Sequence, residues 1–261
     1  MSSARAHDGA AQLHVGSVAG RSAVIRSQAG TPLRLLTPRS RGEMVWAYTS
    51  SFGGGMVAGD CTRLDVTVDA GARCFLSTQA STKIYRNPTN LPCSHELVAK
   101  VGAEAVLMVA PDPVQCFADS SYAQNQRFIL APTANLLFID WMSAGRAACG
   151  ERWAFQRYVS RVEVERGGRK LLLDAIRFDA EDGPLEAKFR GGRFNCFATV
   201  AMFGPTLTVY AQQTLTAIGA QPIAPRSNVV SSAGPLHEGA LLRFAGTSVE
   251  EVGKAIQNQL A

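Results

Sequence analysis

Charged residues are scarce in this chain of 261 residues, at 18% of the total against roughly 25% in an average soluble domain. The net charge is also small, +5, from 26 lysines and arginines and 21 aspartates and glutamates. Such a thin excess, not gathered in one basic patch, does not indicate binding to nucleic acid. Hydrophobic residues make up 46%, a fraction that excludes an intrinsically disordered chain.

Long apolar runs are also missing. A membrane-spanning helix needs roughly 18–20 apolar residues, and the longest candidate, at 105–113, has only the length of a strand. The first 12 residues include Arg5, His7 and Asp8 and no apolar core, so no secretory signal is expected. We predict a cytoplasmic protein that does not bind membranes, with a disordered tail over 1–12 and a single domain over 13–261.

The six cysteines form no C-x-x-C pair. A chain of this length does not need disulfides to stabilise its fold, and unpaired cysteines are usually buried. Widely separated cysteines are also poor candidates for a zinc site, which uses ligands at short spacing. We therefore expect reduced, mostly buried thiols.

The common catalytic motifs are absent too. No G-x-S-x-G sequence occurs, so there is no sign of a serine nucleophile. The glycine-rich segment at 51–60 ends in Asp60 rather than in the Gly-Lys-Ser/Thr of a phosphate-binding loop. Its glycines are typical of a tight backbone passage. The alternative that stays open is a stand-alone β-fold metal-dependent hydrolase that uses Cys93, His95 and acidic residues.

An internal repeat dominates the sequence that is present. Four segments, at 64–76, 97–109, 127–139 and 162–173, each read as a strand, a turn of small residues and a second strand. Aligning the turns on Ala72, Ala103, Ala134 and Gly168 gives spacings of about 31–34 residues, which is typical of stacked supersecondary units. The pattern predicts a mainly β fold, either a β-helix-like stack or a layered antiparallel β architecture.

Helix signals are few. Ser248 and Glu251 form an S-x-x-E capping box, and apolar residues follow at helical spacing, which predicts a C-terminal helix over 248–260. A second helix is expected over 206–218, although its threonines and valine favour strands. We expect about two helices in total.

Several ordered motifs together resemble one protein family. They are SFGGGMVAGD at 51–60, GAR at 71–73, TQASTKIYR at 78–86, PDP at 111–113, FADSSY at 117–122, DWMSAGR at 140–146, GERW at 150–153 and GALLR at 239–243. In this order they resemble the urease accessory protein UreD (UreH) family, from about residue 15 to the C-terminus.

The resemblance implies a stacked, mainly β fold and a non-enzymatic scaffold in urease maturation. It implies a complex with UreF, with the GTPase UreG and with apo-urease, through which nickel is delivered to the urease active site. It also implies an internal, water-filled route for nickel. No stably bound cofactor is expected, because Ni²⁺ would be in transit.

A route for nickel needs ligands that release the ion, and oxygen atoms do so more readily than clustered thiolates or imidazoles. Asp60 follows the glycine passage, while Asp140 and Glu151 flank a bend at 141–150. Burial of Asp140 between Ile139 and Trp141 would raise its pKa unless a cation or a donor pairs with it. We expect these three carboxylates to line the route. The neutral oxygens would come from the polar segment after the first repeat, from Ser77, Thr78 and Thr82.

Overall fold

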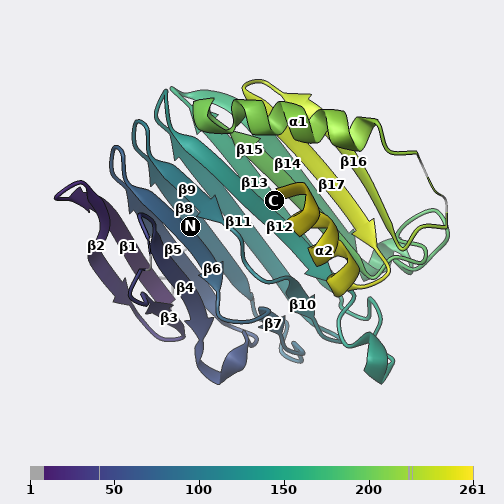
Figure 1. The fold of residues 1–261 in the computed structure, drawn as a ribbon. Coiled ribbons are helices and arrows are strands. Elements are labelled where there is room, and N and C mark those ends of the chain that lie inside the picture. The colour runs from purple at the N-terminus through teal and green to yellow at the C-terminus, as the bar shows by residue number, and fades with distance from the viewer. Residues whose placement is uncertain (1–8, 41, 223, 225, 261) are drawn as a thin grey trace.

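The computed structural model describes residues 9–40, 42–222, 224 and 226–260. Over these residues two β-sheets lie face to face, and helices cover the outer side of one of them (Figure 1). The seven-stranded sheet contains, in spatial order, β14 (Arg169–Asp179), β13 (Arg157–Arg166), β11 (Ser121–Leu130), β8 (Ser94–Val101), β5 (Cys61–Val68), β1 (Gly9–Val18) and β2 (Arg21–Ala29). The ten-stranded sheet contains β16 (Val229–Leu236), β17 (Gly239–Gly246), β15 (Cys196–Phe203), β12 (Asn135–Ser143), β9 (Val106–Val109), β6 (Arg73–Thr78), β4 (Val45–Ser51) and β3 (Leu33–Leu36), together with the short strands β10 (Val114–Cys116) and β7 (Lys83–Ile84).

Both predicted helices are confirmed in the described part of the chain, as α1 (Thr208–Gly219) and α2 (Val249–Leu260). The backbone N–H of Glu251 donates to Ser248 Oγ at 3.2 Å, so the capping box begins α2 as expected. Short 3₁₀ turns lie at η1 (Phe52–Gly54), η2 (Ala147–Cys149), η3 (Ala180–Asp182) and η4 (Pro205–Leu207). None of the described helices is long and apolar enough to cross a membrane.

The first three repeats form stacked coils, which confirms the mainly β, β-helix-like prediction. In each coil the chain passes from the seven-stranded sheet through a turn into the ten-stranded sheet, as β5–β6, β8–β9 and β11–β12. Equivalent strands of successive coils pair in parallel. Antiparallel pairing, which we also considered, joins the strands toward the edges, such as β1–β2, β13–β14 and β15–β17.

Two details of the predicted repeat are wrong. The strand register places Leu97 opposite both Leu64 and Gln126, so the steps are 33 and 29 residues rather than 31 and 31. The buried turn alanine of the second coil is Ala105, whereas Ala103 is exposed. The fourth repeat is not a coil, because β13 and β14 form an antiparallel hairpin within one sheet.

The predicted disordered tail over 1–12 is wrong for residues 9–12. Residues 9–12, which we expected in a disordered tail over 1–12, belong to β1, which pairs in parallel with β5. Ala11, Leu13 and Val15 of this strand are buried, so their apolar side chains fix the strand against the core. Residues 1–8 lie outside the described residues.

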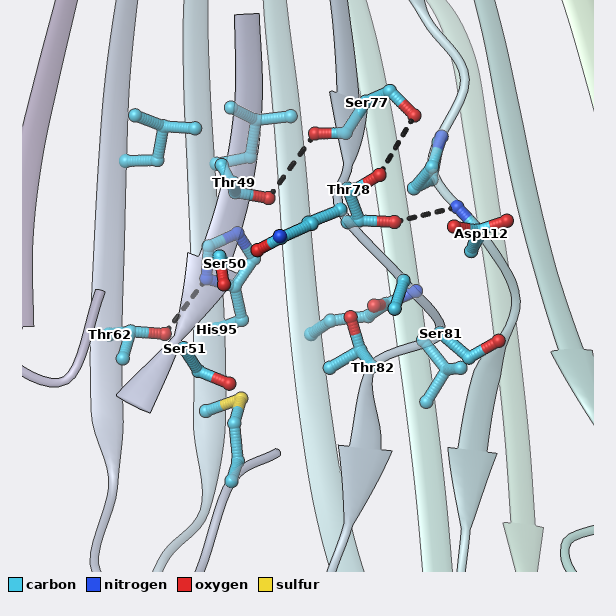
Figure 2. Close-up of a pocket in the computed structure, with 18 of the residues that line it drawn as sticks. Thr49, Ser50, Ser51, Thr62, Ser77, Thr78, Ser81, Thr82, His95 and Asp112 are labelled. Carbon is cyan, nitrogen blue, oxygen red and sulfur yellow. Dashed lines mark hydrogen bonds between the residues drawn. The ribbon is translucent and has the colours of Figure 1, made fainter. Parts of the chain in front are cut away.

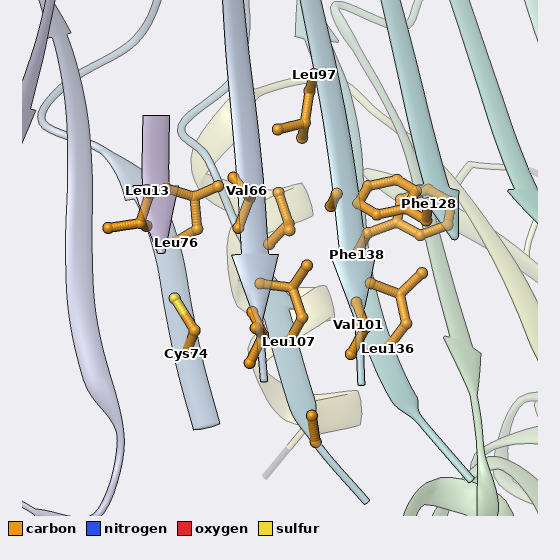
Figure 3. Close-up of a cluster of buried hydrophobic side chains, with 14 of the residues drawn as sticks. Leu13, Val66, Cys74, Leu76, Leu97, Val101, Leu107, Phe128, Leu136 and Phe138 are labelled. Carbon is orange, nitrogen blue, oxygen red and sulfur yellow. The ribbon is translucent and has the colours of Figure 1, made fainter. Parts of the chain in front are cut away.

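The main hydrophobic core fills the space between the sheets near the turns of the coils (Figure 3). Phe128 and Phe138 stack there with ring centroids 5.3 Å apart. Burial of each large apolar side chain contributes roughly 1.5–3 kcal/mol. A second apolar cluster joins the ten-stranded sheet to α1 and α2, and a third lies at the opposite end of the coils around Met56, Cys93 and Met142.

Candidate functional site

A row of polar side chains interrupts the core of the seven-stranded sheet. Thr62, His95, Gln124 and Ser160 are direct neighbours across β5, β8, β11 and β13. They lie on the same inward face as the buried residues two positions further along each strand, Leu64, Leu97, Gln126 and Val162, because strand side chains alternate between faces. Four parallel strands in register therefore place four polar groups in one line between two apolar clusters.

A second polar row belongs to the facing ten-stranded sheet. The register joins Asp140 of β12 to Thr199 of β15, and Thr199 to Arg243 of β17. Nearer the opposite edge of the same sheet, Thr49 of β4 pairs with Thr78 of β6. The two rows together form a polar layer that crosses the molecule at right angles to the strands. We call these nine residues the interior polar layer.

A partly open cavity of about 210 Å³ occupies the N-terminal half of this layer (Figure 2). Eight serine and threonine side chains bring hydroxyl groups to its otherwise largely apolar wall: Thr49, Ser50, Ser51, Thr62, Ser77, Thr78, Ser81 and Thr82. Some of these groups are held by the backbone: Ser77 Oγ donates to the Ala110 carbonyl at 2.7 Å, and the Asp112 N–H donates to Thr78 Oγ1 at 2.8 Å. Among the described residues, Asp112 and Asp140 are the two that bring carboxylates to the wall.

Asp140 is the buried charge of the layer, and both of its oxygens are hydrogen-bonded. Gln124 Nε2 lies 2.6 Å from Oδ1, and the Ser160 hydroxyl donates to Oδ2 at 2.6 Å. Gln124 Nε2 also lies 3.2 Å from the hydroxyl of Tyr158. Burial raises the pKa of Asp140, and the hydrogen bonds from Ser160 and Gln124 oppose this effect without cancelling it. The sequence-based expectation for Asp140 is thus confirmed in direction.

A second hollow reaches Asp140 from the C-terminal side. It is a cleft of about 570 Å³ between β14 and the strands β15, β17 and β16, and Asp140 lines both this cleft and the cavity. Arg243 lies in the cleft, where its guanidinium donates to Asp174 at 2.7 Å and to the Thr199 hydroxyl at 3.2 Å. The Asp140 cluster therefore stands where the two hollows meet.

His95 faces the cavity as a neutral imidazole. Burial lowers its pKa from 6.5 to about 4, because a charged ring is poorly solvated there. Its Nδ1 lies 2.8 Å from Thr62 Oγ1. The ring is visible beside Thr62 at the edge of the cavity in Figure 2.

Four of the six residues that we predicted for nickel transit come together. Ser77, Thr78, Thr82 and Asp140 all line the cavity. The segment at 78–82 is thus a cavity wall, one of the readings that its polar composition allowed. Asp140 itself lies within β12 rather than beside a bend.

Asp60 and Glu151 do not line the cavity. Asp60 stabilises a turn, where its Oδ2 accepts the N–H of Val57 at 2.8 Å. Glu151 pairs with Arg146 and accepts the N–H of Ala118 at 3.2 Å, and these contacts hold the pKa of its carboxyl below the usual value. Both carboxylates thus have local structural partners, and neither has the position that we predicted for it.

The glycine-rich segment forms the tight passage that its composition predicts. A Cβ on Gly55 would lie 2.6 Å from the Lys83 carbonyl oxygen. The backbone there pairs with the neighbouring segment, since the Met56 N–H donates to Lys83 O and the Tyr85 N–H donates to Met56 O. Only glycine permits this approach without a shift of the backbone.

The geometry gives no support to the hydrolase alternative. Burial raises the pKa of the Cys93 thiol to about 12, so the thiolate that nucleophilic attack requires is not formed at neutral pH. Within the described part of the chain, no hydrogen bond joins Cys93 to His95. The described residues also contain no group of three His, Cys, Asp or Glu side chains that could hold one metal ion.

Comparison with known proteins decides the family. The model of the UreD urease accessory protein family matches residues 7–261. The chain belongs to the UreD urease accessory protein family. It is 45% identical over 254 residues to the urease accessory protein UreD of Sorangium cellulosum, covering 97% of this chain and 80% of the relative.

Two further relatives agree with this assignment. Urease accessory protein UreD of Anaeromyxobacter sp. is 43% identical, with 97% of this chain and 84% of the relative covered. Urease accessory protein D of Oryza sativa subsp. indica is 31% identical, with 100% and 94% covered. Membership of the UreD family supports a role in urease maturation and is consistent with a non-enzymatic protein.

Proposed function

We propose that this UreD-family protein acts with UreF and the GTPase UreG on apo-urease, and that nickel reaches the urease active site through its interior polar layer. Family membership supports the role in urease maturation. The observation that carries the route is Asp140, a buried carboxylate that lines both the cavity and the cleft. We place this activity in the cytoplasm, in keeping with six cysteines that are all free thiols.

The chemistry of the layer suits passage better than storage. Hydroxyl and amide oxygens are weak ligands for a divalent cation, and polar groups of this kind in the wall allow the ion to leave again. Ser77, Thr78 and Thr82 supply neutral oxygens on the cavity side of Asp140. The carboxylate of Asp140 then attracts the ion, but the neighbouring groups are too weak as ligands to bind it stably.

Asp140 would act as the stepping point between the two hollows. An arriving cation favours the ionised carboxylate, which burial alone disfavours. For the ion to bind, the hydrogen bonds from Gln124 and Ser160 must be exchanged for contacts with the metal. When the ion leaves, Gln124 and Ser160 form their hydrogen bonds to Asp140 again.

Reconstitution with purified components tests the role itself. Apo-urease, UreF, UreG, GTP and limiting Ni²⁺ are combined with or without this chain, and urease activity and bound nickel are measured. We expect activation only when the chain is present, and co-elution of the chain with UreF, UreG and apo-urease. Equal activation without the chain would refute the proposed role.

A further inference from the structure

Among the described residues of the cavity wall, His95 is the only imidazole, whose unprotonated ring nitrogen can bind a metal ion. Its ring sits on β8 beside Thr62 and opposite the hydroxyl-rich wall from Ser77 to Thr82 (Figure 2). The proposed passage uses oxygen ligands and leaves this imidazole without a function. Cys93, two residues earlier, is buried outside the cavity wall, so the two side chains do not face the cavity together.

The hydrogen bonds around Thr62 accommodate one tautomer of His95 that leaves a nitrogen open to the cavity. The Thr62 hydroxyl can donate its one proton to the Ser94 carbonyl, 3.3 Å away. Its oxygen then accepts the N–H of His95 Nδ1 at 2.8 Å. In this tautomer the ring proton lies on Nδ1, and Nε2 carries a lone pair.

That lone pair has no competitor within the described residues. No hydrogen bond to Nε2 is formed by a described side chain or backbone group, and no carboxylate pairs with the ring. The hydrogen bond from Nδ1 to a threonine oxygen is the kind of outer contact that orients a metal-binding histidine. The site thus has an oriented, neutral imidazole nitrogen at the wall of a polar cavity.

We propose that His95 Nε2 is a transient ligand for the transition-metal cation that crosses the cavity, and that it favours nickel over magnesium. The proposal rests on the proposed function. Imidazole suits Ni²⁺, Cu²⁺ and Zn²⁺, whereas carboxylate, carbonyl and water oxygens suit Mg²⁺ and Ca²⁺. A wall of oxygens alone would not distinguish nickel from more abundant hard cations, and one nitrogen adds that distinction without closing a stable site.

Nuclear magnetic resonance of the full chain, labelled with ¹⁵N at its four histidines and kept in solution by unlabelled UreF, tests the site without urease. Long-range ¹H–¹⁵N correlation should show the proton of His95 on Nδ1. Substoichiometric Ni²⁺ should then broaden the His95 ring signals, and an equal concentration of Mg²⁺ should leave them unchanged. The variant His14→Gln is the matched control, because His14 pairs with Asp69 at the surface, and His95 should still respond in it.

Nickel transfer in the assembled complex tests the selectivity. With Mg²⁺ in large excess, His95→Gln should lower nickel incorporation into apo-urease by about fivefold, and by less than about twofold without Mg²⁺, because the lost nitrogen is what separates the two ions. A proton on Nε2, or broadening confined to the other histidines, would overturn the proposal. If Asp140→Asn left transfer unchanged while Ni²⁺ still broadened His95, the route would be wrong and the metal ligand would stand.

Discussion

At the scale of single residues, Asp140 is the position where stability and function should oppose each other. A buried carboxylate with a raised pKa is less stable in its ionised form inside the protein than in water. Ionisation of Asp140 at neutral pH therefore lowers the free energy of unfolding. A carboxylate at such a position is explained more readily by an arriving cation than by packing.

The variant Asp140→Asn removes the charge and keeps a side chain that can bond to both Gln124 and Ser160. We expect the melting temperature at neutral pH to rise by roughly 2–4 °C, the shift that ~1 kcal/mol produces in a chain of this size. Differential scanning calorimetry measures it, with Asp60→Asn as the surface control. A lower melting temperature for Asp140→Asn would show that the ionised carboxylate stabilises the fold.

The lowered pKa of His95 predicts how the free energy of unfolding falls as the solution is acidified. The unfolded state takes up the proton near pH 6.5 and the folded state near pH 4, so the stability is complete above pH 6.5 and is lost as the pH falls toward 4. The slope should approach about 1.4 kcal/mol per pH unit. Urea unfolding at several pH values, for the wild type and for His95→Gln, isolates this term.

The raised pKa of Asp140 affects stability in the opposite direction, but it is common to both proteins and cancels in their difference. The wild type should therefore lose stability relative to His95→Gln on acidification. A constant difference between the two proteins from neutral pH to pH 5 would show that His95 is not held in its neutral form.

At the scale of elements, the stacked coils meet most closely at their turns. The Gly102 N–H donates to the Val68 carbonyl at 2.8 Å, and a Cβ on Gly102 would lie 2.6 Å from the backbone nitrogen of Ala70. Gly102→Ala should destabilise the protein by about 1–3 kcal/mol, because backbone must move. Gly219→Ala, where no atom lies within 4 Å, is the control and should be neutral or slightly stabilising by helix propensity. Urea midpoints of both variants measure the difference.

The stacked coils and both helices could be predicted from the sequence because their signals are local. Alternation, small turn residues and the Ser248 cap each act within a few positions along the chain. The repeat spacing was misjudged because the stretch between the coils varies in length, and the register of hydrogen bonds, not a fixed period, aligns Ala72 with Ala105. The hairpin at β13–β14 could not be predicted from the sequence. A coil that crosses between the sheets and a hairpin within one sheet give the same strand–turn–strand pattern.

The candidate site was predicted in part for the same reason. Ser77, Thr78 and Thr82 follow an apolar strand, and Asp140 lies within one, so their burial was readable. Asp60 and Glu151 were misplaced, since turn composition does not tell which side chains reach the interior. The row of Thr62, His95, Gln124 and Ser160 was missed. Each of these residues occupies an inward position two residues before a buried one on its strand. That the four side chains form one row can be recognised only once the strand register is known.

At the scale of the whole molecule, apolar side chains are exposed along the N-terminal edge strands and their neighbour β4. Ile25 of β2 and Trp46 of β4 are 50% and 46% exposed, and Val24 and Leu36 are also exposed. Exposed apolar side chains on open sheet edges favour association. We expect the chain to be poorly soluble alone and to become soluble when co-expressed with UreF. A monodisperse, equally soluble monomer in both cases, measured by light scattering, would contradict this.

Nickel transfer through the complex tests the central claim most directly. Complexes of UreF and UreG with the wild-type chain, Asp140→Asn or Asp60→Asn are loaded with limiting ⁶³Ni²⁺, and the rate at which apo-urease acquires the label is measured after assembly has been verified by size exclusion. Passage through the interior polar layer predicts a loss of about tenfold or more for Asp140→Asn, since the buried carboxylate that lines both hollows is gone. For Asp60→Asn it predicts a wild-type rate. A wild-type rate for an assembled Asp140→Asn complex would contradict the claim.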